Sequence, residues 1–151
     1  MRKLLSACIL LSLASTCVAR PVADWPYEKL SKEADLIVIA TPTQTEDTGE
    51  KTNLPGVARN NNPVPGFGVN TTFQVLAVLK GGQEMKTFVL FHLREAEPKE
   101  TTVNAPTLVS FNPKEKKRYL LFLKRETDGR FTPLCGQTDP AGAVKDLGVS
   151  P

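Results

Sequence analysis

The sequence predicts a mainly β protein, a small antiparallel barrel with one short helix before it and one after it. Short apolar runs separated by turn residues recur along residues 34–136, which is typical of strands. Helical patterns occur only at the two ends, so strands and helices do not alternate as they do in a parallel sheet. About six short antiparallel strands favour closure into a barrel, because closure removes exposed strand edges.

The N-terminus has the features of a secretory signal peptide. Two basic residues precede an apolar run at residues 4–13, and small residues precede an expected cleavage after Ala19. The apolar run is shorter than the roughly 20 residues that span a bilayer. We therefore expect no transmembrane segment and a secreted or periplasmic protein. The alternative is a lipoprotein modified at Cys8 or Cys17.

The expected mature chain is nearly neutral. Residues 20–151 keep 17 of the 19 basic residues beside all 16 acidic ones, so the net charge falls from +3 to +1. The most basic stretch, residues 114–118, is interrupted by Glu115 and is typical of a solvated turn. Nucleic-acid binding requires a basic face, so nucleic acid is not an expected partner. The length fits one domain over residues 20–151.

The first element expected in the mature chain is a short helix over residues 24–35. Pro26 suits its first turn. Tyr27, Leu30 and Ala34 recur at helical spacing, and we expect this face to pack on a sheet.

Six strands are expected after the helix, because each segment is short and rich in β-branched, aromatic or other apolar residues. They are residues 34–42, 71–82, 86–95 and 107–111, and the two segments 118–126 and 130–136 around Asp128 and Gly129, a two-residue hairpin signal. Asp139 and Pro140 then begin a short C-terminal helix that ends at Gly148.

Residues 43–70 interrupt this pattern. Three prolines, four glycines and five asparagines occur within these 28 residues, which predicts a long loop. Such loops are uncommon in compact domains and are often functional or disordered. Two interpretations stay open: a flexible insertion in a hairpin, or a binding loop in which Arg59 and Phe67 are the best contact residues.

Cys135 is the only cysteine of the expected mature chain, so no internal disulfide can form. With His92, the only histidine, it would supply the nucleophile and base of a thiol-dependent enzyme. Counting back from the hairpin turn instead places it opposite Phe122, an apolar site that makes a thiol inert. Pairing with another chain is a third possibility. One histidine and one cysteine do not make a zinc site without carboxylates, so no metal or cofactor is expected.

Three stretches carry a resemblance to a known group. They are "EADLIVIATP" within residues 30–42, "TFQVLAVLKGG" within 71–82, and "KRYLLFLKRETDGRFTPLCGQTDP" within 117–147. Together they resemble the bacterial relatives of the netrin-like, tissue-inhibitor-of-metalloproteinases-like proteins, over about half of the expected mature chain. The resemblance implies a five-stranded OB-type barrel and an exported, non-catalytic binding module. The animal inhibitors bind the protease zinc through an N-terminal cysteine, which the expected start at Arg20 lacks, so protease inhibition is not implied.

The expected function is therefore binding without catalysis, with another protein or a cell-envelope component as the ligand. The barrel mouth and residues 43–70 are the expected binding surface, because OB barrels bind through inter-strand loops. Two alternatives remain: a thiol-dependent hydrolase or exchange enzyme that uses Cys135 and His92, and a structural envelope lipoprotein.

Overall fold

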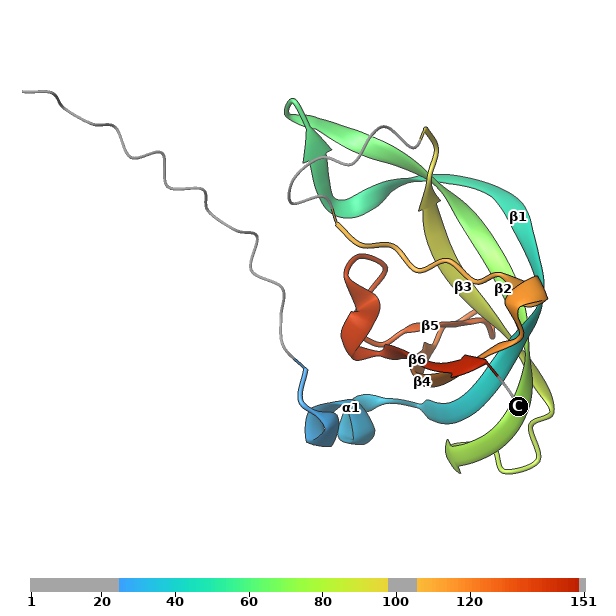
Figure 1. Cartoon of the computed structure of the whole chain (residues 1–151). Helices are drawn as coiled ribbons and strands as arrows, with labels where there is room; N and C mark the ends of the chain where they lie inside the picture. The colour runs from blue at the N-terminus through green and yellow to red at the C-terminus, as the bar shows by residue number, and fades with distance from the viewer. Residues whose placement is uncertain (1–24, 98–105, 150–151) are drawn as a thin grey trace, which may run out of the picture.

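The computed structural model describes residues 25–97 and 106–149, so the predicted signal peptide lies outside the described residues (Figure 1). Strands dominate, which confirms the mainly β prediction. The elements are α1 (Tyr27–Glu33), β1 (Leu36–Arg59), β2 (Asn62–Lys80), β3 (Thr87–Glu95), β4 (Lys117–Arg125), β5 (Phe131–Pro133), β6 (Val144–Val149), and the single-turn 3-10 helices η1 (Pro113–Glu115) and η2 (Pro140–Gly142).

The sheet closes into a ring of five strands. β2 pairs antiparallel with both β1 and β3. β5 pairs in parallel with β3 and antiparallel with β4. β4 in turn pairs antiparallel with the first residues of β1, which closes the ring. The sixth strand, β6, pairs with β4 alone and is not one of the five strands that form the ring.

Apolar side chains from alternate strand positions fill the interior of the ring. Phe73 is fully buried, stacks on Phe88 at 5.3 Å between ring centroids, and meets Phe111 edge-on at 5.0 Å. Full burial of one such side chain contributes roughly 1.5–3 kcal/mol. The buried members of this inner cluster are Leu36, Val38, Ala40, Phe73, Phe88, Leu90, Phe111, Tyr119, Leu121, Leu123 and Phe131.

The helix α1 covers part of the outer wall of the ring. Its Leu30, and Ala34 just after it, are buried against Ile37 of β1 and Phe122 of β4. The predicted helix and its packing on a sheet are therefore confirmed. Tyr27 lies on the same predicted face but stays 59% exposed, with its ring 5.9 Å from that of Phe122.

The predicted loop over residues 43–70 is wrong, because β1 and β2 continue through this range as one long paired hairpin. Pairing extends to Arg59 opposite Asn62. Only Asn60 and Asn61 connect the strands, both with positive φ (51° and 61°). These values suit the type I′ turn, whose twist matches that of a hairpin. Two glycines of the range lie where the pairing register shifts, at bulges.

Two further element predictions are wrong. Residues 107–111 form no strand, although Phe111 still enters the core. The predicted C-terminal helix is only the single turn η2, and the chain then continues as β6. A helix of this length is marginal without strong packing. β5 covers only residues 123–125 of β4. The backbone of residues 117–121 therefore stays available, and β6 pairs with it as a strand.

The hairpin predicted around Asp128 and Gly129 is confirmed, with a pairing that differs by one residue. Arg125 lies opposite Phe131, so the loop has three residues, 127–129. Gly129 has φ +87°, as expected for the residue that ends a three-residue loop with a bulge.

Candidate binding surface on the long hairpin

A row of cation, aromatic ring and cation crosses three strands of the hairpin region. Lys51 of β1 lies opposite Phe67 of β2, and Phe67 lies opposite Arg94 of β3. Directly opposed residues project from the same face of a sheet. The Lys51 Nζ is 5.9 Å from the Phe67 ring centroid, and the Arg94 Cζ is 4.9 Å from it. We call these three residues the Phe67 row. Its ring stays partly exposed between two exposed cations.

Asp47 holds the arginine end of the row in place. Arg94 donates from Nε to Asp47 Oδ1 at 2.8 Å and from Nη2 to Oδ2 at 2.5 Å. Such two-bond pairs fix geometry as well as charge. Hydrogen bonding with Arg94 lowers the pKa of Asp47 below its usual value. Lys51 makes no ion pair within the described part of the chain, so the row keeps a positive charge at its β1 end.

Arg59, the other residue predicted to contact a ligand, stands apart from the row. It is the last residue of β1, and its Nη1 donates to Glu95 Oε1 at 3.0 Å. This ion pair ties the end of the hairpin to β3. No described contact joins Arg59 to Phe67, so the structure does not bring the two predicted residues together.

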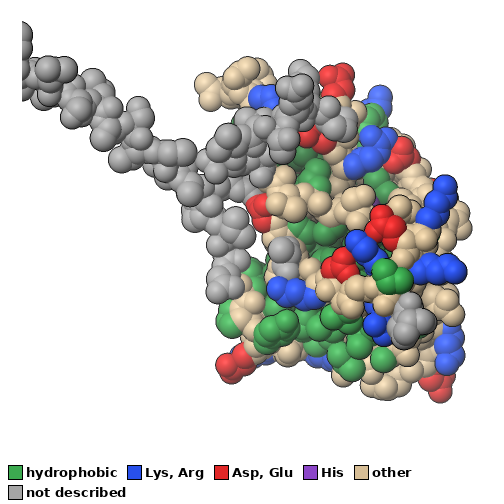
Figure 2. Space-filling view, in the orientation of Figure 1, with side chains coloured by type: hydrophobic (Ala, Val, Ile, Leu, Met, Phe, Trp, Pro, Cys, Tyr) green, Lys and Arg blue, Asp and Glu red, His purple; other side chains and the backbone are tan. Residues whose placement is uncertain are grey.

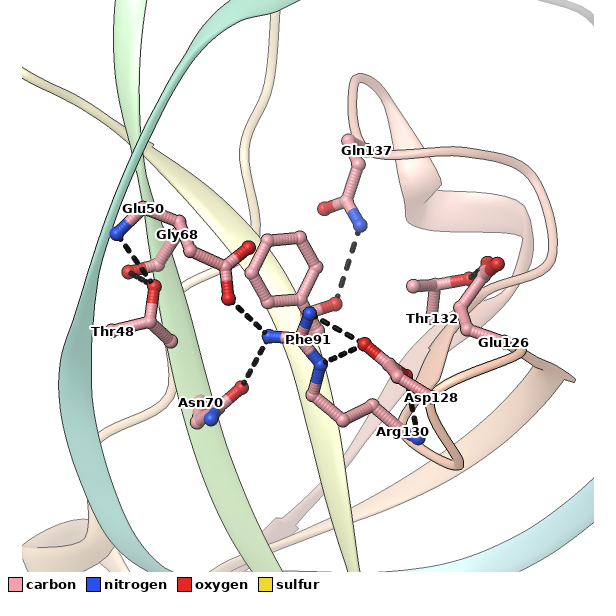
Figure 3. Close-up of polar contacts among 10 residues, drawn as sticks. All are labelled: Thr48, Glu50, Gly68, Asn70, Phe91, Glu126, Asp128, Arg130, Thr132 and Gln137. Atoms are coloured by element: carbon pink, nitrogen blue, oxygen red, sulfur yellow. Dashed lines mark hydrogen bonds and ion pairs between the residues drawn. The ribbon is translucent and has the colours of Figure 1, made fainter.

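A second polar cluster lies where the hairpin passes the β4–β5 turn (Figure 3). Arg130 Nη1 donates to Glu50 at 2.8 Å and to Asn70 at 3.5 Å, while its Nε donates to Asp128 at 2.7 Å. The guanidinium also lies over the ring of Phe91, 4.3 Å from its centroid. Because two carboxylates surround this arginine, the cluster joins the hairpin to the turn rather than offering a free charge.

Sequence reasoning missed the charged residues of both clusters. One usable signal was present, because Thr41, Thr43 and Thr45 alternate in the way that β-branched residues do in strands. That signal would have extended the first strand and suggested a face for its charges. It would not have predicted the hydrogen bond between Arg130 and Glu50, which are 80 residues apart in the sequence. That contact forms only because the closed sheet places the β4–β5 turn beside the hairpin.

His92 is buried inside the ring. It is 3% exposed, and its Nε2 lies 2.9 Å from Thr71 Oγ1, which in turn lies 3.1 Å from Thr45 Oγ1. Its ring meets Phe111 edge-on at 5.2 Å. Burial lowers the pKa of His92 to about 4, so the imidazole is neutral at neutral pH.

Cys135 packs on the outer wall of the ring, in the cluster that lies beneath α1. The Leu134 N–H donates to the Phe122 carbonyl at 3.0 Å, so Leu134, and not Cys135 as predicted, is opposite Phe122. Burial raises the pKa of the Cys135 thiol, which keeps it protonated at neutral pH. No described contact joins it to His92, which faces the inner cluster.

Within residues 25–97 and 106–149, no group of three or more histidine, cysteine, aspartate and glutamate side chains could hold a metal ion. No helix in this part of the chain is long and apolar enough to cross a bilayer. No protein-family model and no curated protein matches the chain.

Proposed function

We propose that the chain is an exported, non-catalytic binding module with an OB-type barrel, and that the Phe67 row contacts its ligand, a protein or a cell-envelope component. The observation that carries this proposal is the row itself, a partly exposed aromatic ring between two cations on a paired sheet.

The strand arrangement supports an OB-type barrel. That fold is a five-stranded, partly open Greek-key barrel which binds ligands on strands 2 and 3 and on the connections between strands 1 and 2 and strands 4 and 5. Here β2 and β3 carry Phe67 and Arg94, and the β1–β2 connection is the long hairpin. The β4–β5 turn contacts the hairpin through Arg130, on the face of the sheet opposite to the Phe67 row. The resemblance to the netrin-like group implies the same fold.

The Phe67 row has the composition of a binding hot spot. Aromatic residues and arginine are enriched at the energetic centres of interfaces. Cross-strand pairing and the Asp47 bonds already order two of the three side chains, which reduces the entropy lost on binding. The exposed charge of Lys51 beside the apolar ring suits a ligand with an acidic group next to an apolar surface.

The separate locations of His92 and Cys135 support the non-catalytic part of the proposal. A thiol enzyme needs a base within hydrogen-bond reach of its nucleophile. His92 instead bonds to Thr71 inside the ring, while Cys135 belongs to the outer cluster. Each has a pKa shifted away from the value that such chemistry needs.

Site-specific photo-crosslinking in exporting cells tests the proposed surface. A photoreactive phenylalanine analogue replaces Phe67 or, as a control, the exposed Gln74 of the same strand. We expect a discrete crosslinked product from position 67 only, and a lower yield when Lys51→Ala is added. Equal products from both positions, or no product from position 67, would contradict the proposal.

Intact mass of the exported protein tests its processing. We expect the mass of residues 20–151. A mass larger by a diacyl modification would favour the structural lipoprotein instead.

A further inference from the structure

A pocket opens at the end of the ring away from the long hairpin, where β1 begins and β4 ends. Its volume is about 410 Å³, which lies in the range of small-molecule sites, and the mouths of β-barrels are common places for such sites. Leu36 of β1, Arg125 of β4 and Phe131 of β5 line it, together with Met85 of the β2–β3 connection. The Phe67 row lies at the other end of β2, so the two sites are separate.

The floor of this pocket is apolar. Leu36 and Phe131 are buried members of the inner cluster, and Met85 packs against the same cluster. A methionine side chain adapts its shape to its neighbours more readily than a branched one. Gly82 leaves space beside it, since a Cβ at that position would lie in ordinary contact with the Met85 Cε, at 3.8 Å. A small apolar group can therefore pack here against the end of the core.

Two opposite charges border the pocket. Arg125 is exposed, and its guanidinium makes no ion pair and no hydrogen bond within residues 25–97 and 106–149. Asp35 is also exposed, but its position is fixed. Its Oδ2 accepts the Arg125 backbone N–H at 2.9 Å, and its own N–H donates to the Leu123 carbonyl at 2.9 Å. The two side chains thus border one pocket without neutralising each other.

These two charges act locally. On the face that Figure 2 shows, basic and acidic side chains are interspersed and form no patch of one sign. A broad field of one sign would favour a large charged partner. Among the described residues, Arg125 is the only cation and Asp35 the only anion that line the pocket. This pair suits a small ligand that carries both charges.

We infer that this pocket binds a free apolar α-amino acid, with its carboxylate at Arg125, its ammonium group at Asp35 and its side chain on the apolar floor. A guanidinium and a carboxylate match in shape and form two parallel hydrogen bonds, and an ammonium group donates to a carboxylate. A fatty acid would leave Asp35 without a partner, and an apolar amine would leave Arg125 without one. Because one carbon joins the two charges of an amino acid, a single ligand reaches both residues.

The test compares three ligands on the purified exported protein. They are leucine, N-acetyl-leucine, which lacks the ammonium charge, and leucinamide, which lacks the carboxylate. Calorimetry gives the dissociation constants. We expect leucine to bind at least about tenfold more tightly than either analogue, because each analogue loses a charge-assisted hydrogen bond. Methyl NMR shifts should concentrate at Leu36 and Met85, and glycine, which has no side chain, should bind more weakly than leucine.

Variants assign the two parts of the site. Arg125→Gln should weaken leucine binding to the level of leucinamide and leave the affinity for leucinamide unchanged. Lys124→Gln is the matched control, because the exposed neighbour on β4 projects from the opposite face. It should leave both affinities unchanged. Gly82→Leu places a side chain in the space beside Met85 and should abolish the binding of all three ligands.

Three results would overturn the inference. They are the absence of saturable leucine binding, an affinity for leucine no higher than for either analogue, and leucine binding that is unchanged in Gly82→Leu. The last result would place the ligand elsewhere on the protein. None of these results bears on crosslinking from position 67, because the pocket and the Phe67 row share no residue.

Discussion

The roles of His92 and Cys135 follow from where each side chain is buried. His92 lies inside the ring, where its neutral ring bonds to Thr71. Cys135 lies outside the ring, where burial disfavours its thiolate. Their residue types suggested a catalytic pair, but a β-sheet wall separates His92, which faces the inner cluster, from the outer cluster that contains Cys135.

Stability should fall on acidification because of His92. Its pKa is about 4 when folded, against an ordinary value of 6.5, so the unfolded chain binds more protons between these pH values. The free energy of unfolding should therefore decrease from pH 6.5 to about pH 4 and then level off for this group. The full loss is about 3 kcal/mol. Urea unfolding at pH 7 and pH 4 should show a smaller loss in His92→Gln, and equal losses in both proteins would contradict the buried neutral histidine.

The Cys135 thiol should react slowly in the folded protein. Because burial raises its pKa, a chromogenic disulfide should modify it at least about tenfold more slowly than the same thiol in denaturant. The two rates, measured at pH 7 on one sample, check this. A fast reaction in the folded state would restore the thiol-enzyme alternative.

At the scale of elements, the long hairpin has its own small core. Leu54 and Val64 from its two strands are buried with Leu93 of β3. Gly68 allows β2 to lie close to its neighbours, since a Cβ there would be 2.6 Å from both the Phe91 ring and Thr48 Oγ1. Apolar contacts as well as turn chemistry therefore keep the range 43–70 folded.

Leu54→Ala should destabilise the protein by roughly 2–5 kcal/mol, the usual cost of a buried leucine. A flexible loop would tolerate the same change. Chemical denaturation measures the effect, and the neighbouring exposed Thr52→Ala should change stability by less than about 0.5 kcal/mol. A negligible effect of Leu54→Ala would contradict the hairpin.

At the scale of the whole molecule, ring closure divides β1 into two parts. Residues 37–40 pair with both β2 and β4, whereas the strand beyond them pairs with β2 alone. The first part contributes Leu36, Val38 and Ala40 to the inner cluster, and the second extends past the ring (Figure 1). The two parts should therefore open independently.

Native-state hydrogen exchange measures this difference. Hydrogen-bonded amides of residues 36–40 should exchange only by global unfolding, with a denaturant dependence equal to that of the whole protein. Those of residues 51–59 should exchange faster, through local opening with a smaller dependence. A uniform denaturant dependence along β1 would show that hairpin and ring open as one unit.

The sequence by itself determined the β-rich class, the position of α1, and the strands of residues 34–42 and 86–95. These features depend on local periodicity and on turn residues that are adjacent in the chain. Tertiary structure decided the rest. The polar strand through residues 43–59 forms because β2 pairs with it, and residues 144–149 form a strand rather than a helix because β4 has a free edge. The contact of Arg130 with Glu50 also depends on elements that meet only after the sheet has closed.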